Sequence, residues 1–231
     1  MSISWLEISA PFAAYRYFQA GDYRASSPII PYSAAWGLVL NLAGIEIRTN
    51  TERPTTEIDP NAPKLQLAIG AISHAEKSSL YQQLHSYPVG PSGKDFKGRT
   101  KGNKYWIAPV RREILVGLEA IIGVKTNNSE VHHRLADGVK GKLKVERYGL
   151  PFAGDNNLLF DKINLLEKPK RCFWYSLVGS SEQSRPNSCR LSVKIDRADS
   201  SNSVSLLFAP AVEASDVVPA EAWIWTPEKP S

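Results

Sequence analysis

The hydrophobic and polar positions of the N-terminal part change period along the chain, which predicts a strand followed by a helix. Residues 2–11 (SISWLEISAP) alternate weakly, as expected of a half-buried strand. Residues 13–28 are polar and aromatic and end in a Ser-Ser-Pro turn signal, so this stretch is predicted to be mostly loop. Apolar side chains then recur at helical spacing over residues 34–46, with Ser33 as a suitable N-cap and Gly44 as a suitable stop.

The middle of the chain is predicted to contain two core strands with a long hairpin between them. Residues 64–72 (KLQLAIGAI) and 114–124 (ILVGLEAIIGV) are apolar and predict core strands. Two β-prone pieces, residues 78–87 and 103–113, flank a polar, glycine-rich centre. This arrangement predicts a hairpin with a flexible tip.

The remaining residues predict a second short helix and then a series of strands. The helix begins near Ser129 and ends at Gly138. The Pro-bounded tail, residues 218–231, predicts a terminal strand or an extended arm. Segregated helices and several antiparallel strands favour an α+β fold, and their order is compatible with the ferredoxin-like β-α-β-β-α-β arrangement. Three more strands are predicted at residues 172–178, 189–196 and 203–211.

Composition favours a cytoplasmic protein with a hydrophobic core. The 231 residues are 42% hydrophobic, and no stretch approaches the roughly 20 apolar residues that span a bilayer. The N-terminus lacks the basic and apolar regions of a signal peptide, so we expect no membrane association. The two cysteines, Cys172 and Cys189, lack the spacing of a zinc site and are predicted to be reduced. We expect neither a metal nor a cofactor.

Cations are concentrated in the predicted hairpin, within a chain of net charge +5. Aromatic residues lie among them, at Phe96, Tyr105 and Trp106, whereas Asp95 is the one acid between Gly93 and Arg112. Dense cations attract phosphates, and aromatic rings offer stacking surfaces for unpaired bases. The hairpin is therefore a candidate RNA-binding element, the alternative being a solvated loop that its charge keeps soluble. The cations are Lys94, Lys97, Arg99, Lys101, Lys104, Arg111 and Arg112.

A second basic and aromatic group lies nearer the N-terminus. Arg16, Tyr17 and Arg24 suit RNA because arginine binds phosphate or stacks on a base, and tyrosine has both a ring and a hydroxyl. The neighbouring Phe12 and Phe18 are predicted to be ordinary core residues.

Enzyme motifs are scarce, since no phosphate-binding loop, dinucleotide fingerprint, zinc-protease motif or nucleophile elbow occurs. A metal-independent ribonuclease remains an alternative, with His85, Tyr87 and Lys104 meeting across the hairpin. His132 and His133 are predicted to be a surface pair rather than metal ligands, because adjacent helix residues point in different directions.

Two segments resemble the fifth Cas protein family. Residues 11–46 carry an aromatic–Arg pair, Tyr15-Arg16, that leads through a Pro-rich loop into a glycine-containing helix. Residues 147–163 (RYGLPFAGDNNLLFDKI) are similar to a second family segment, although as a local pattern they suit a tight turn equally well. The basic hairpin lies where this family inserts its thumb.

The resemblance implies a RAMP-superfamily subunit of a type I Cascade, with one RRM-like domain over residues 1–231. A thumb would be inserted at about 73–113, and a C-terminal antiparallel β extension would cover about 165–231. Arg16, Tyr17 and Arg24 would contact the 5′ handle of the crRNA. The turn from Gly154 to Asn156 would contact the RNA backbone, and the thumb would supply Lys94, Lys97, Arg99, Lys101 and Lys104.

The resemblance also implies partners. These are the crRNA 5′ handle, the Cascade backbone subunit and the large subunit, with target DNA reached through the complex. If the system is a CRISPR-guided transposon, transposition proteins would be added. One branch of the family cuts crRNA precursors, but the segments here are more similar to the non-cleaving branches. Two alternatives remain: an endoribonuclease that matures crRNA, and an adaptor whose basic loop docks an acidic protein.

Overall fold

The computed structural model describes residues 2–20, 23–49, 52, 56–88, 105–179 and 185–229. Within them the chain forms a large sheet, a small two-stranded sheet and two α-helices, which confirms the predicted mixture of helix and strand. The helices are α1 (Tyr32–Leu42) and α2 (Ser129–Val139), with short 3₁₀ turns at Ser200–Asn202 and Ala220–Ala222. The strands are β1 (Ser2–Ala13), β2 (Arg16–Ala20), β3 (Tyr23–Ser26), β4 (Arg48–Thr49), β5 (Glu57–Ile58), β6 (Leu65–Ala71), β7 (Glu76–Pro88), β8 (Tyr105–Thr126), β9 (Lys162–Leu166), β10 (Phe173–Leu177), β11 (Cys189–Lys194), β12 (Val204–Pro210) and β13 (Ile224–Thr226).

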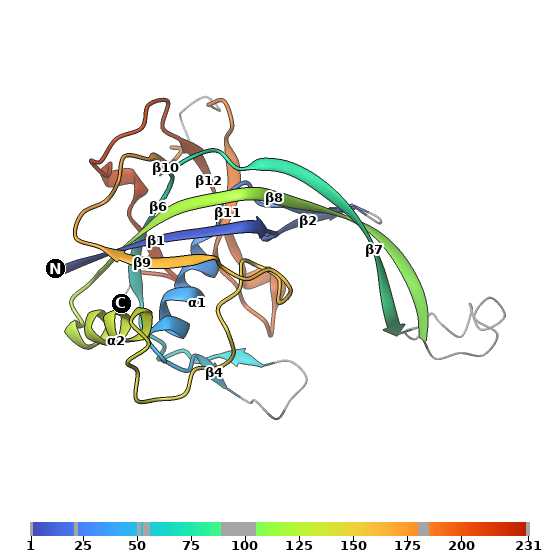
Figure 1. Ribbon diagram of the computed structural model, residues 1–231, viewed down its shortest axis with the longest axis horizontal. Helices are drawn as coiled ribbons and strands as arrows, with labels where there is room; N and C mark the ends of the chain where they lie inside the picture. The colour runs from blue at the N-terminus through green and yellow to red at the C-terminus, as the bar shows by residue number, and fades with distance from the viewer. Residues whose placement is uncertain are drawn as a thin grey trace.

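Four strands form the centre of the large sheet, in the order β6-β8-β1-β9, and each is antiparallel to its neighbour. Helix α1 follows β1 in the chain, and α2 lies between β8 and β9. The strands predicted near the C-terminus extend this sheet beyond β6 in the order β10-β12-β11, and β13 also pairs with β6. Figure 1 shows both helices on one side of the curved sheet.

Each face of the sheet has its own hydrophobic core, because successive strand residues point to opposite faces. Leu6 and Ile8 of β1 lie fully buried in the larger core, together with side chains of α1 and α2. Trp5 lies on the other face, in a smaller core that includes Trp174. The C-terminal segment contributes Ala222, from the 3₁₀ turn Ala220–Ala222, to this second core. This segment therefore covers part of the sheet face opposite the helices.

Helix α1 lacks the predicted side-chain cap. It begins at Tyr32 rather than after Ser33, and Pro31 occupies the N-cap position without a side-chain hydrogen bond. Tertiary packing fixes this end of the helix, because Tyr32 is fully buried and its hydroxyl donates to the carbonyl of Ala222 at 2.9 Å. The predicted stop at Gly44 agrees with its positive φ of 62° just beyond the helix.

Helix α2 begins at Ser129, as predicted, but continues through Gly138 to Val139. Asn128 caps it by accepting a hydrogen bond from the Glu130 amide at 3.0 Å. Gly138 is a contact residue rather than a stop, since a Cβ there would lie 1.7 Å from the carbonyl oxygen of Leu42. The glycine therefore allows the two helices to pack closely.

The segment from 13 to 28, predicted to be mostly loop, contains strands β2 and β3 instead. They pair with each other, and β3 also pairs in parallel with β8, at Tyr23↔Arg111 and Arg24↔Arg112. The local sequence did not reveal β3 as a strand because its partner β8 lies almost 90 residues further along the chain, and β2 in turn pairs with β3. Neither described helix is long and apolar enough to cross a membrane.

A long β-hairpin extends from the body of the molecule. Strands β7 and β8 pair from Glu76↔Val116 out to Pro88↔Tyr105, and the hairpin projects away from both helices in Figure 1. The second arm and the following core strand, predicted as separate pieces, are one strand of 22 residues. The tip, residues 89–104, lies outside the described residues.

Candidate nucleic-acid interface

A cleft of about 440 Å³ lies at the base of the hairpin, where β2, β3 and β8 meet the loop that precedes β9. We call it the arginine cleft, after three arginines from three different strands. It is lined by Ala14, Tyr15, Arg16, Arg24, Ala25, Arg112, Glu113, Gly154 and Asp155.

Strand pairing brings the three arginines together. Arg24 of β3 lies opposite Arg112 of β8, and paired residues of neighbouring strands point to the same face. Arg16 belongs to β2, which is antiparallel to β3, and it lies opposite Ser26 of β3. Ser26 is two residues along β3 from Arg24. Residues two apart in a strand share a face, so Arg16 joins the same group. The sequence predicted each of these arginines separately as an RNA ligand, and the fold places them around one cleft.

Two of the three guanidinium groups are available for a ligand. Arg16 is exposed and Arg24 is half-buried, and neither guanidinium has a hydrogen-bond or ion-pair partner among the described residues. Arg112 forms an ion pair with the Asp155 carboxylate, with the nearest nitrogen and oxygen 2.5 Å apart. Grouped cations repel one another, and a bound anion would relieve that repulsion. The cleft therefore suits a ligand with negative charges.

The loop of residues 152–159 forms one wall of the cleft. It is closed by pairing between Phe152 and Leu159, and Asn156 is exposed at its turn. Gly154 has φ +87°, and a Cβ there would lie 2.4 Å from the carbonyl oxygen of Ala14. Only glycine lets the loop approach β1 this closely, so Gly154 positions the neighbouring Asp155.

Glu113 organises the other side of the cleft. Its carboxylate accepts hydrogen bonds from the Tyr23 hydroxyl at 2.6 Å and from the Ser26 amide at 3.2 Å, and Lys77 lies 3.1 Å away. Burial alone would raise the pKa of Glu113, but these donors outweigh it and lower the pKa below its usual value. The same hydrogen bond raises the pKa of Tyr23. Glu113 is thus a charged anchor that fixes β3 against β8.

Several predicted ligands lie outside the cleft. Tyr17 accepts a hydrogen bond from the Arg190 amide at 3.3 Å, which ties β2 to β11. Arg111 points to the face opposite Arg112, and Asn156 lies at the exposed turn. Phe12, predicted to be a core residue, is 45% exposed, because the alternation of β1 is interrupted near its end, where Ala13 follows Ala10 into the core. Lys94, Lys97, Arg99, Lys101 and Lys104 lie outside the described residues, as does the side chain of Phe18.

The residues of the alternative ribonuclease are not described: Lys104 and the side chains of His85 and Tyr87 lie outside the described part. His132 is not the surface residue that was predicted. It is half-buried, and its Nδ1 lies 2.7 Å from the Ser4 hydroxyl on β1. Among the described residues, no group of three or more histidine, cysteine or acidic side chains could hold a metal ion.

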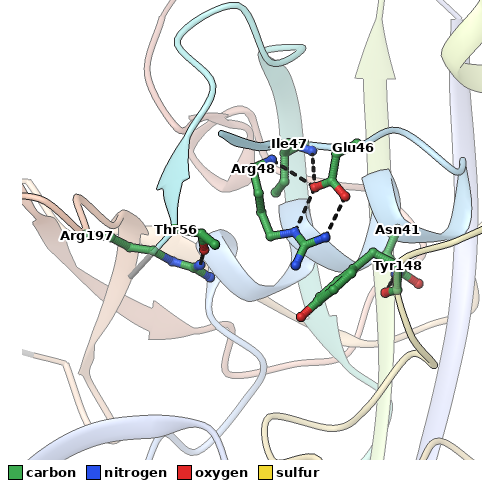
Figure 2. A network of polar contacts seen from close by, with 7 residues as sticks. All are labelled: Asn41, Glu46, Ile47, Arg48, Thr56, Tyr148 and Arg197. Carbon is green, nitrogen blue, oxygen red and sulfur yellow. Dashed lines mark hydrogen bonds and ion pairs between the residues drawn. The ribbon is translucent and has the colours of Figure 1, made fainter. Parts of the chain in front are cut away.

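A second site, centred on the single arginine Arg48, lies near β4 and has a different organisation (Figure 2). We call it the Arg48 latch. The Arg48 guanidinium donates twice to the Glu46 carboxylate, at 2.8 and 2.7 Å. Its charged carbon also lies 2.9 Å from the ring centroid of Tyr148. Asn41 of α1 donates to the Tyr148 carbonyl at 2.8 Å. The latch thus joins α1, β4 and the loop after α2.

The sequence analysis did not identify Glu113 as a residue of the arginine cleft, and it did not identify Asp155 as the ion-pair partner of Arg112. Glu113 directly follows the Arg111-Arg112 pair, so its position beside the cations was visible. Its partner Tyr23 was not, because the pairing of β3 with β8 has no local signature. Asp155 lay inside the loop that was identified as a turn.

Comparison with solved structures identifies the fold. A chain titled "CRISPR RNA-guided surveillance complex" is 10% identical, with 96% of each chain covered and a TM-score of 0.58. A crystal structure of a Cas protein is 11% identical, covering 94% of this chain and 98% of that one, with a TM-score of 0.49. No protein-family model and no curated protein matches the sequence. The chain therefore shares its fold with a chain of a CRISPR surveillance complex, in agreement with the resemblance to a Cas family.

Proposed function

We propose that this chain is the non-catalytic subunit of a type I CRISPR Cascade that holds the 5′ handle of the crRNA. The observation that carries the proposal is the arginine cleft. Arg16, Arg24 and Arg112, all predicted as RNA ligands, line one cleft beside the predicted backbone-contacting loop at Gly154. The cleft offers phosphates two guanidinium groups, those of Arg16 and Arg24, that have no partner among the described residues. Single-stranded RNA exposes phosphates and base edges together.

The topology supports a RAMP-type core. The order β1-α1-β6-β8-α2-β9 along the chain, with β6-β8-β1-β9 in the sheet, matches the ferredoxin-like β-α-β-β-α-β plan. The β7–β8 hairpin lies between the second and third strands of this plan, where the resemblance implies a thumb. The predicted RNA-binding lysines and Arg99 of its tip lie outside the described residues.

Partners follow from the same proposal. The crRNA handle would occupy the cleft, the Cascade backbone subunit and the large subunit would adjoin it, and target DNA would be reached through base pairing with the guide. In such complexes, pairing reads the target sequence while the protein positions the guide. Transposition proteins would join in the case of a CRISPR-guided transposon, and the site of action would be the cytoplasm.

The proposal is tested by equilibrium binding of the purified chain to a repeat-derived handle RNA and to a shuffled RNA of equal length. We expect preferential binding of the handle, with an affinity that falls as salt rises, because phosphate contacts release counterions. Equal affinity for both RNAs would contradict the proposal.

The same samples test the ribonuclease alternative. We expect the full repeat RNA to be recovered uncut after incubation without metal. Cleavage that is abolished by His85→Ala would replace the non-catalytic role with crRNA maturation.

A further inference from the structure

Three side chains from three neighbouring strands form a row on the hairpin face opposite Arg24 and Arg112. Tyr23 of β3 lies opposite Arg111 of β8, which in turn lies opposite Tyr81 of β7. Paired residues share a face, and the next residues along β3 and β8 point the other way. The row is therefore tyrosine, arginine, tyrosine, and it does not belong to the arginine cleft.

The row presents its flat and charged groups to solvent. Tyr81 is 73% exposed, Arg111 is exposed and Tyr23 is half-buried. A ring this exposed contributes little to packing, since it forgoes most of the burial that normally stabilises an aromatic side chain. Adjacent strands lie about 4.8 Å apart, so the backbones that carry the two tyrosines are about 10 Å apart, with the arginine between them.

The charge on Arg111 is not neutralised within the described residues. Glu113 shares its face, two positions along β8, but this carboxylate is held by the Tyr23 hydroxyl and by Lys77 at 3.1 Å. No ion pair joins Arg111 to a described residue. The row thus combines a cation that has no ion-pair partner in the described part of the chain with an exposed ring and a second ring fixed by its hydroxyl.

We infer that this row, Tyr23–Arg111–Tyr81, binds one unpaired nucleotide, with its base stacked on Tyr81 and its phosphate paired with Arg111. The inference rests on the proposed RNA-binding function and adds a second contact surface to it. Strand β7 pairs only with β8 among the described strands, so its outer edge is open. A single strand held in the arginine cleft can pass around this edge and reach the row, so that the RNA contacts both faces of the hairpin base.

A nucleotide is favoured over a protein partner by the composition of the row. Its exposed members are a ring and a cation, flanked on the same face of β7 by the polar, exposed Ser79 and Gln83. A protein-docking surface would have an apolar centre, whereas the centre of this face, among the described residues, is the charged Arg111. Stacking is sequence-tolerant because every base has a π face, so the row would hold the strand in place without selecting its sequence.

The test uses a set of handle RNAs, each with 2-aminopurine at one position, bound to the full-length protein. We expect one position whose fluorescence is quenched on binding, with the quenching lost in Tyr81→Ala and retained in Tyr81→Phe. Loss of the ring should weaken RNA binding by between about 5-fold and 150-fold, whereas the phenylalanine variant should stay within about twofold. Arg111→Gln should weaken binding and lower its salt dependence.

The matched control is Tyr148→Ala, which removes an equally prominent tyrosine, 65% exposed, from the Arg48 latch. It should leave RNA binding unchanged. If Tyr81→Ala binds and quenches as the unmodified protein does, the inference is wrong while the proposed function stands. If Tyr81→Ala instead weakens only assembly with other subunits, the row is a protein contact and the inference also fails. If no handle RNA binds at all, the proposed function itself is contradicted.

Discussion

The arginine cleft and the Arg48 latch use the same side chain for opposite purposes. In the latch, the Arg48 donors are bound by Glu46 and its face is covered by Tyr148, so the Arg48 side chain is only 16% exposed. The latch holds three chain segments together. In the cleft, Arg16 and Arg24 have no described partner. A satisfied arginine stabilises a fold, whereas an unsatisfied cluster costs folding energy through repulsion and retains its capacity to bind. The difference between them lies in their partners, which the residue type does not reveal.

The largest effect on RNA binding is expected when the charge of the arginine cleft is reversed. Arg16→Glu with Arg24→Glu should weaken handle binding about a hundredfold or more, because charge-assisted hydrogen bonds contribute about 1.5–3 kcal/mol each. The slope of log affinity against log salt should fall by about 1.4, which corresponds to two single-strand phosphate contacts. Fluorescence anisotropy at several salt concentrations measures both quantities.

The control for charge alone is Lys140→Glu with Lys142→Glu, which changes the net charge equally at two exposed positions near the end of α2. It should leave the salt slope close to that of the unmodified protein. If both double variants weaken binding equally, RNA responds to net charge and the cleft has no special role.

A second prediction concerns the wall of the cleft. Gly154→Ala should lower the free energy of unfolding by about 2 kcal/mol, because a Cβ is strained at φ +87° and would clash with the Ala14 carbonyl. Gly149→Ala is the matched control, since Gly149 also has a positive φ, of 67°, but no atom within 4 Å of a new Cβ. Thermal or denaturant unfolding should show the smaller loss for Gly149→Ala. Equal losses would mean that close packing at Gly154 contributes nothing.

The smallest effect is expected at the latch. Its arginine lowers the pKa of Glu46 to about 2, first through the hydrogen bonds from Arg48. A lowered folded-state pKa stabilises the protein above the unfolded value near 4.5, and this contribution is lost as the pH falls towards 2. Glu46→Gln should therefore lower stability at neutral pH by about 1 kcal/mol or less, since the side chain is 49% exposed.

The difference in stability between Glu46→Gln and the unmodified protein should shrink as the pH is lowered from 4.5 towards 2, and RNA affinity at neutral pH should not change. Unfolding curves over this pH range test the first statement. A variant that keeps its stability deficit at pH 2 would show that the ion pair is not its source.

Much of the fold was predictable because its elements carry local patterns. The apolar alternation of β6 and the helical spacing of α1 predicted their positions, and the three runs near the C-terminus form β10, β11 and β12. Strands β2 and β3 were missed because they depend on pairing rather than on their own composition: β3 pairs with the distant strand β8, and β2 pairs with β3. The predicted start of α1 was wrong because the helix begins at the buried Tyr32, with Pro31 and not Ser33 at the N-cap position.

The candidate site was predictable in its residues but not in its arrangement. Arg16, Arg24 and Arg112 were identified by type and neighbourhood, yet their meeting depends on a parallel pairing between distant segments. Tyr81 was not identified, because its role emerges only from the register that places it beside Arg111. The residue types suited to binding RNA can be predicted from the local sequence, whereas the strand topology decides which of them lie together.

The central claim is that the arginine cleft binds the handle RNA, and a map of the contacts between protein and RNA tests it most directly. Handle RNAs that carry 4-thiouridine are photo-crosslinked to the protein, and the crosslinked peptides are identified by mass spectrometry. The account predicts crosslinks to peptides from β2, β3 and the loop at 152–159, and none to the peptides that contain Arg48 or Tyr148. Crosslinks concentrated at the Arg48 latch, or scattered evenly over the surface, would contradict it.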